Sequence, residues 1–237
     1  MPNWVRTRLT FNGEQNRVAE IKELVKTTGK NAQGKYTNEF DFNKVIPMPE
    51  ELNIPSSSSG EWGMRYLLLN AKHSFLWTED DRSFMEIMEK QKKNDPDRFN
   101  DDIELGKKYL SNISKYGYKD WYDWACSDDG WGTKWGTSDV EWVSDNCVEF
   151  ETAWSFCHPI VKKLSEMFPD VAIEAEWSDE DAGSNTGSIE IHNKVYIREN
   201  YPDDGSNEAY KLYKELWGCD DIVYDEETDS YKWIDEN

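Results

Sequence analysis

Residues 147–177 read CVEFETAWSFCHPIVKKLSEMFPDVAIEAEW. Apolar side chains take alternate positions over the first eight residues and again from Val171 to Trp177, with glutamates between them. This alternation predicts two strands that each bury one face. Between the strands, Pro159 suits the first turn of a helix, and the apolar stripe of that helix comprises Ile160, Val161, Leu164 and Phe168. The segment is therefore predicted to form a strand–helix–strand unit.

A second unit of the same kind is predicted at the start of the chain. Residues 3–12 alternate between apolar and polar side chains, and residues 14–28 carry an apolar stripe at helical spacing. Residues 36–46 place Phe40 and Phe42 at alternate positions, which predicts another strand. Two such units on one antiparallel sheet predict an α+β protein with the ferredoxin-like split β-α-β fold.

A helical insertion of about residues 50–137 is predicted between the two units. The run PSSSSG at 55–60 predicts a flexible bridge into it. Thr78 precedes three acidic residues and predicts the start of a helix, which Asn94-Asp95-Pro96 would end. Apolar residues at helical spacing predict a further helix over about 97–116.

The chain beyond about residue 190 is predicted to extend the ferredoxin-like domain of residues 1–190. Residues 189–197 predict a hairpin, and Ser206 is expected to cap a helix that Gly218 ends. Two short segments at 222–224 and 231–234 are predicted to pair across an acidic turn. The region 191–237 is thus expected to be an acidic extension packed on the same core.

The net negative charge of the chain comes entirely from its second half. The 237 residues include 27 Lys and Arg against 48 Asp and Glu, which gives a formal net charge of −21. Residues 1–118 contain 18 basic and 18 acidic residues, whereas residues 119–237 contain 9 basic and 30 acidic residues. The same half holds 9 of the 12 tryptophans. This distribution favours either a solvated, solubilising surface or an acidic surface for a basic partner, with cation binding as a third interpretation.

Several classes of protein are disfavoured by the composition. Direct binding to nucleic acid is not expected, because it depends on basic patches that replace the counterions of phosphates. The sequence has no run of 18 apolar residues and its N-terminus lacks the apolar core of a signal peptide, so we expect a cytoplasmic protein that does not contact membranes. Cys126, Cys147, Cys157 and Cys219 show no C-x-x-C spacing and no suitably spaced histidines. Neither a metal site nor a cofactor is therefore expected.

Four blocks of sequence resemble one known family. They are MPNW at residues 1–4, FNKVIPMP at 42–49, WYDW at 121–124 with WGTKW at 131–135, and FETAWS at 150–155. Together these blocks resemble the YubB-like proteins, which are encoded by plasmids and phages and contain a ferredoxin-like domain. The resemblance runs from residue 1 to about residue 190. It implies the fold and an origin in a mobile element, and it supplies no catalytic residue.

Two groups of side chains are candidates for a functional site. The first is a set of acids expected to bind a partner: Asp179, Glu180, Asp181, Asp220, Asp221, Asp225, Glu226 and Glu227. The second is an aromatic set around one lysine: Trp121, Tyr122, Trp124, Trp131, Lys134 and Trp135. The aromatic set is either a core layer that holds the insertion or a platform for a ligand.

The sequence therefore favours a non-enzymatic, acidic protein-binding module of a phage or plasmid. In its most specific form, the protein would mimic DNA and inhibit a host defence or nucleic-acid enzyme, because carboxylates at fixed spacing can occupy a basic channel. The alternative is a small-ligand-binding module or an enzyme with a Trp-lined pocket near residues 121–135. A structural role in a phage particle is a third possibility.

Overall fold

The computed structural model describes residues 2–27 and 40–234. The chain forms two compact units. One unit contains the described parts of 1–47 and 125–237, and the other is Met48–Trp124. The expected insertion of about 50–137 thus corresponds to a unit that ends at Trp124. Residues beyond it belong to the first unit, where Thr133 Oγ1 donates a hydrogen bond of 2.7 Å to the carbonyl of Ala153.

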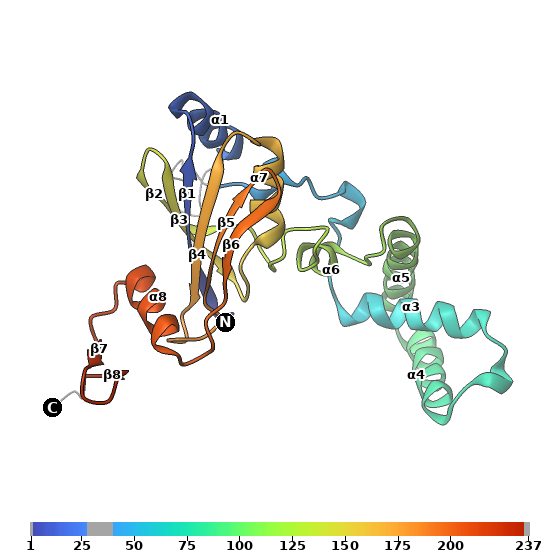
Figure 1. The fold of residues 1–237 in the computed structure, drawn as a ribbon. Helices are drawn as coiled ribbons and strands as arrows, with labels where there is room; N and C mark the ends of the chain where they lie inside the picture. Colours follow the sequence, from blue (N-terminus) through green and yellow to red (C-terminus); the bar gives the residue numbers. More distant parts are fainter. Residues whose placement is uncertain (1, 28–39, 235–237) are drawn as a thin grey trace. The chain divides into compact units, whose positions relative to one another are not determined.

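The first unit contains a six-stranded sheet in the order β2-β3-β1-β4-β5-β6, with neighbouring strands antiparallel (Figure 1). Its strands are β1 Trp4–Asn12, β2 Ser138–Ser144, β3 Cys147–Ala153, β4 Ala172–Asp179, β5 Gly187–His192 and β6 Val195–Asn200. Helix α1 (Gln15–Val25) follows β1, and α7 (His158–Met167) connects β3 to β4. The order β2-β3-β1-β4 with these two helices is the ferredoxin-like arrangement, so the predicted fold class is confirmed.

The strand predicted over residues 36–46 is wrong for its described part. Residues 36–39 lie outside the described residues, and Phe42–Val45 form a short helix, α2. Asp41 caps that helix by accepting a hydrogen bond from the backbone N–H of Asn43, while Phe40 forms only an isolated bridge with Lys26. The second strand of the ferredoxin-like core is instead β2, which follows the insertion.

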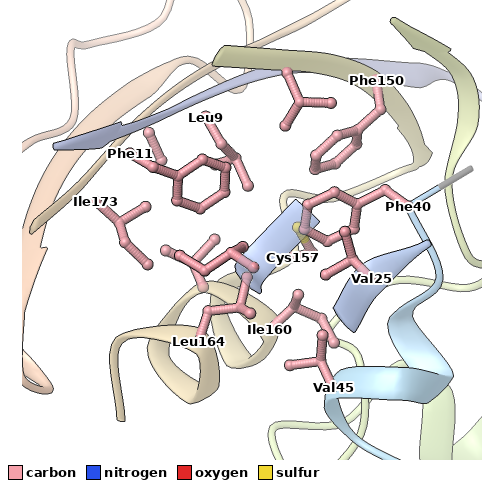
Figure 2. Packing of buried hydrophobic residues seen from close by; sticks show 14 of the residues in the cluster. Leu9, Phe11, Val25, Phe40, Val45, Phe150, Cys157, Ile160, Leu164 and Ile173 are labelled. Carbon is pink, nitrogen blue, oxygen red and sulfur yellow. The ribbon is translucent and has the colours of Figure 1, made fainter. Parts of the chain in front are cut away.

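A single apolar layer lies between one face of the sheet and its helices (Figure 2). Leu9, Phe11, Phe150 and Ile173 from the strands face Ile160 and Leu164 of α7, as the alternating patterns predict. Because strand side chains alternate, burial of this set places the polar set on the opposite face of the sheet. We call that opposite side the outer face.

The elements after β4 lie where the sequence predicted them. The β5–β6 hairpin turns at Asn193 and Lys194, which both have positive φ, as a two-residue turn requires. Helix α8 (Asn207–Trp217) begins with Ser206 as its cap and ends at Gly218 with φ 63°. Strands β7 (Ile222–Asp225) and β8 (Ser230–Trp233) form the separate two-stranded sheet.

The unit Met48–Trp124 is mainly helical. Its elements are η1 Glu50–Leu52, α3 Ser58–Ala71, η2 Ser74–Leu76, α4 Glu79–Asn94 and α5 Pro96–Tyr116, and α6 Trp121–Ala125 begins in it. The run 55–60 is not a flexible bridge, because the Ser57 side chain accepts a hydrogen bond from the Gly60 N–H and caps α3. Helices α3 and α5 approach closely at Gly63, where a Cβ atom would lie 1.8 Å from the carbonyl oxygen of Asp102.

Gly63→Ala is expected to destabilise this helical unit. Alanine gains about 1 kcal/mol in helix propensity over glycine, but the new Cβ meets backbone that cannot move aside alone. Separation of α3 from α5 should therefore cost about 1–3 kcal/mol, typical of overpacking. Urea unfolding followed by circular dichroism would measure the loss. Gly136→Ala, which has no neighbour within 4 Å, is the control, and equal stability of the two variants would contradict the packing described.

Candidate protein-binding surface

The outer face of the sheet is rich in charge. Strand register places an acidic majority on it: Glu141 of β2, Glu149 and Glu151 of β3, Glu174 and Glu176 of β4, and Glu190 of β5, against Arg6 and Arg8 of β1 and Arg198 of β6. The face therefore carries more carboxylates than guanidinium groups. Helix α8 covers part of it, because the Trp217 indole N–H donates a 3.2 Å hydrogen bond to the Ser178 carbonyl.

Arg8 is the central cation of this face. Its Nε donates to Glu149 Oε1 at 2.7 Å on one side, and one terminal nitrogen donates to Glu176 Oε2 at 3.4 Å on the other. The other terminal nitrogen donates to the backbone carbonyl of Glu215 in α8 at 3.4 Å. Burial acts to lower the pKa of Arg8, but the hydrogen bond and charge of Glu149, with the charge of Glu176, raise it above its ordinary value. Arg8 therefore joins β3, β4 and α8.

Two pairs of glutamates oppose each other directly across neighbouring strands. Glu141 lies opposite Glu149, and Glu174 lies opposite Glu190. Like charges in directly opposite positions destabilise a sheet. Asn12 partly compensates one pair by donating a 2.8 Å hydrogen bond to Glu174. Arg8 and, at 3.7 Å, Arg198 offset part of the repulsion at Glu149 and Glu190, but the two pairs still place four carboxylates next to one another in the sheet.

A groove of about 490 Å³ lies between the outer face and α8. Its carboxylates are Glu174 and Glu176 from β4 and Glu208 and Glu215 from α8, and its cations are Arg198 and Lys211. Both cations form long and therefore weak ion pairs. Lys211 lies 4.0 Å from Glu215, and Arg198 lies 3.7 Å from Glu190, which does not line the groove. The groove therefore keeps a net negative charge with both acidic walls accessible.

A second acidic group surrounds Arg6 at the other end of the same face. The Arg6 guanidinium lies 3.7 Å from Asp139 and 5.4 Å from the ring centre of Trp217. Burial raises the pKa of Glu151, and the charges of Asp139 and Glu180 raise it further against the opposing effect of Arg6. Asp139, Glu151 and Glu180 therefore act on one another around a single arginine.

The structure separates the acids predicted to bind a partner. Asp179 is only 5% exposed and accepts hydrogen bonds from the side chains of Asn3 and Asn185 and from the backbone N–H of Asp181. Its carboxylate therefore orders the loop after β4 and does not belong to an exposed surface. Glu180 and Asp181 are exposed beside it.

The remaining predicted acids follow α8. Asp220 and Asp221 are exposed, and Asp221 lies near Tyr213 together with Asp181. Burial raises the pKa of Tyr213, and these two carboxylates raise it further. Asp225 accepts a 2.9 Å hydrogen bond from Lys232 across the β7–β8 hairpin, while the exposed pair Glu226 and Glu227 forms the turn. The acids predicted to bind a partner are thus divided between the loop after β4, the segment after α8 and the β7–β8 hairpin.

The aromatic candidates are divided between the two compact units. Trp121, Tyr122 and Trp124 belong to the helical unit, and Trp131, Lys134 and Trp135 belong to the unit of the sheet. The Trp131 indole N–H donates a 3.0 Å hydrogen bond to the Ile46 carbonyl, and Trp131 lines a hollow of about 250 Å³ with Phe42. Lys134 Nζ lies 4.6 Å and 4.3 Å from the ring centres of Trp135 and Trp154.

The described part of the chain contains neither a candidate group of metal ligands nor a candidate membrane-spanning helix. Within residues 2–27 and 40–234, no group of three or more His, Cys, Asp or Glu side chains is placed to hold a metal ion. No helix among these residues is both long and apolar enough to cross a membrane. The four cysteines are free thiols, of which Cys157 is fully buried.

Comparisons with known proteins gave a family match, to the second half of the chain, and a similar crystal structure. Residues 130–220 match the family described as "Ferredoxin-like domain in Api92-like protein". A crystal structure of the protein api92 from Yersinia pseudotuberculosis aligns over 86% of this chain and 99% of its own, with 10% sequence identity and a TM-score of 0.38. Comparison with curated proteins gave no match. The match to residues 130–220 is thus to a ferredoxin-like domain, in agreement with the fold of this part of the chain.

Proposed function

We propose that this protein is a non-enzymatic binding module that holds a basic surface of a partner protein against its acidic outer face. The observation that carries the proposal is the placement of Glu141 opposite Glu149 and of Glu174 opposite Glu190. A solubilising surface can place its acids on loops, where they do not oppose one another in a sheet. Carboxylates that are kept in such opposed positions, although their repulsion weakens the local sheet, are typical of functional surfaces.

The groove beside α8 gives this surface a defined receptor for cationic side chains. Its two walls present Glu174 and Glu176 on one side and Glu208 and Glu215 on the other. A guanidinium or ammonium group between them would gain charge-assisted hydrogen bonds. The net charge of −21 would also attract a basic partner over a distance and speed association at low salt.

More specifically, the partner's basic surface would belong to a channel that binds nucleic acid. Carboxylates at fixed strand spacing can occupy a basic channel that otherwise accepts phosphates. The partner would then be a host defence or nucleic-acid enzyme, and DNA would compete with this protein for it. The resemblance to the plasmid- and phage-encoded YubB-like proteins is consistent with such a role in the cytoplasm of a host cell.

Neutralising the groove should weaken binding more than neutralising other acids. A fluorescent peptide of alternating arginine and valine would serve as the probe, with anisotropy measured at low salt and at about 0.3 M NaCl. Glu174→Gln, Glu208→Gln and Glu215→Gln together should lower the affinity about tenfold, because each exposed ion pair contributes about 0.2–1 kcal/mol. Competition by duplex DNA for a captured partner would support the more specific form.

The matched control makes the same change of charge in the helical unit, with Glu50→Gln, Glu86→Gln and Asp101→Asn. These three side chains are exposed, so the control retains the groove and loses the same net charge. Equal loss of affinity in the two triple variants would show that overall charge alone attracts the peptide, and it would overturn the proposed site.

Glu141→Gln should make the protein more stable at low salt. The change removes the repulsion of Glu149 and leaves the bond between Glu149 and Arg8 intact. The expected gain is on the order of 0.3 kcal/mol and should fall as salt screens the charges. Urea unfolding at two salt concentrations measures it, with Glu86→Gln as the control. A loss of stability would contradict the view that this pair is held against the preference of the sheet.

A further inference from the structure

A cavity of about 600 Å³ lies at the end of β1, where the chain enters α1, and shares no lining residue with the acidic groove. Its lining comes from three places: Phe11, Asn12 and Gly13 at the end of β1; Gln15, Val18, Ala19 and Lys22 on α1; and Asp145 and Asn146 in the turn between β2 and β3. A volume of this size is typical of sites for small molecules.

The floor of this cavity is apolar and well packed. Phe11 is 1% exposed and Val18 is 4% exposed, so both belong to the core. The ring of Trp142 stacks on Phe11 with 6.2 Å between ring centres. Lys22 Nζ lies 4.5 Å above the same indole ring. Trp142 itself does not line the cavity, so the apolar lining comes from Phe11, Val18 and Ala19, with Lys22 beside it, and this lining suits an apolar or aromatic group.

The backbone around the cavity is held in place before any ligand binds. The N–H of Phe11 donates to the Asn146 carbonyl at 2.9 Å, and the Asn146 side-chain amide donates back to the Phe11 carbonyl at 3.2 Å. Gly13 lies so close to Val171 that a Cβ would be 2.8 Å from its side chain. The turn and the start of α1 are thus both fixed against the sheet.

The lining of the cavity carries one cation and one anion, from different elements. Lys22 belongs to α1 and Asp145 to the β2–β3 turn. Within residues 2–27 and 40–234, neither side chain forms an ion pair. Lys22 contacts the Trp142 ring, but among these residues neither charge has an oppositely charged side chain as its partner, so the lining offers one cation and one anion to a molecule that carries both charges.

We infer that this cavity binds a zwitterionic amino acid with an apolar or aromatic side chain. Lys22 would pair with the ligand carboxylate, Asp145 would pair with its ammonium group, and Phe11 and Val18 would contact its side chain. An organic anion without an amine would place its negative charge near Asp145. An amine without a carboxylate would place its positive charge near Lys22. The inference is independent of the acidic outer face.

The test is a nitrogen–proton NMR titration of the full chain with L-phenylalanine. Saturable shifts are expected for amides of residues 11–22 and 144–147. 3-Phenylpropionate, which lacks the ammonium group, and phenethylamine, which lacks the carboxylate, should each bind at least about tenfold more weakly, as expected when one charge-assisted pair is lost. Absence of saturable shifts, or equal binding by either analogue, would overturn the inference.

Variants assign the two charges separately. Lys22→Met and Asp145→Asn should each weaken phenylalanine binding by about tenfold or more. Lys26→Met is the control, because Lys26 directly follows α1, four residues after Lys22, and does not line the cavity. Unchanged unfolding midpoints establish that the variants fold. Full binding by either cavity variant, or an equal loss in Lys26→Met, would contradict the assigned roles.

Discussion

The register of β1 between β3 and β4 is the constraint on which the rest of this structure depends. A shift of one residue would move the whole apolar set of the strand to the outer face. Arg8 reinforces the observed register from the polar side, because its guanidinium bonds to Glu149 and Glu176, its direct partners on the two neighbouring strands. The same side chain holds the backbone of α8 through Glu215. The side chains of β1 thus contribute to the core on one face of the sheet and to the charged surface on the other.

Elements with strong local signals were predictable from the sequence. The alternation in 147–154 and 171–177 predicted β3 and β4, and Ser206 and Gly218 marked the ends of α8. Strand β2 was not predicted, because register shifts interrupt its pairing with β3 and most of its side chains are exposed. At Phe40 and Phe42 the apolar alternation predicted a strand that the structure does not contain, because Asp41 caps a short helix there.

The candidate sites required information that no local pattern contains. The sequence identified an excess of acids in the second half, but it did not show that Asp179 is buried in loop hydrogen bonds. The opposition of Glu174 to Glu190 follows from strand pairing alone. Likewise, Lys22 and Asp145 are more than a hundred positions apart, and only the fold brings them to one cavity. Charge composition predicted the kind of surface, and topology determined its place.

Carboxylate footprinting would test the central claim most directly. Exposed carboxylates are coupled to glycine ethyl ester with and without the alternating arginine–valine peptide, and labelling is read for each residue by mass spectrometry. If the outer face is the binding surface, the peptide should protect Glu174, Glu208 and Glu215 and leave Glu50 and Glu86 unchanged. Uniform protection of all exposed carboxylates, or protection confined to Glu226 and Glu227 in the β7–β8 turn, would contradict the account.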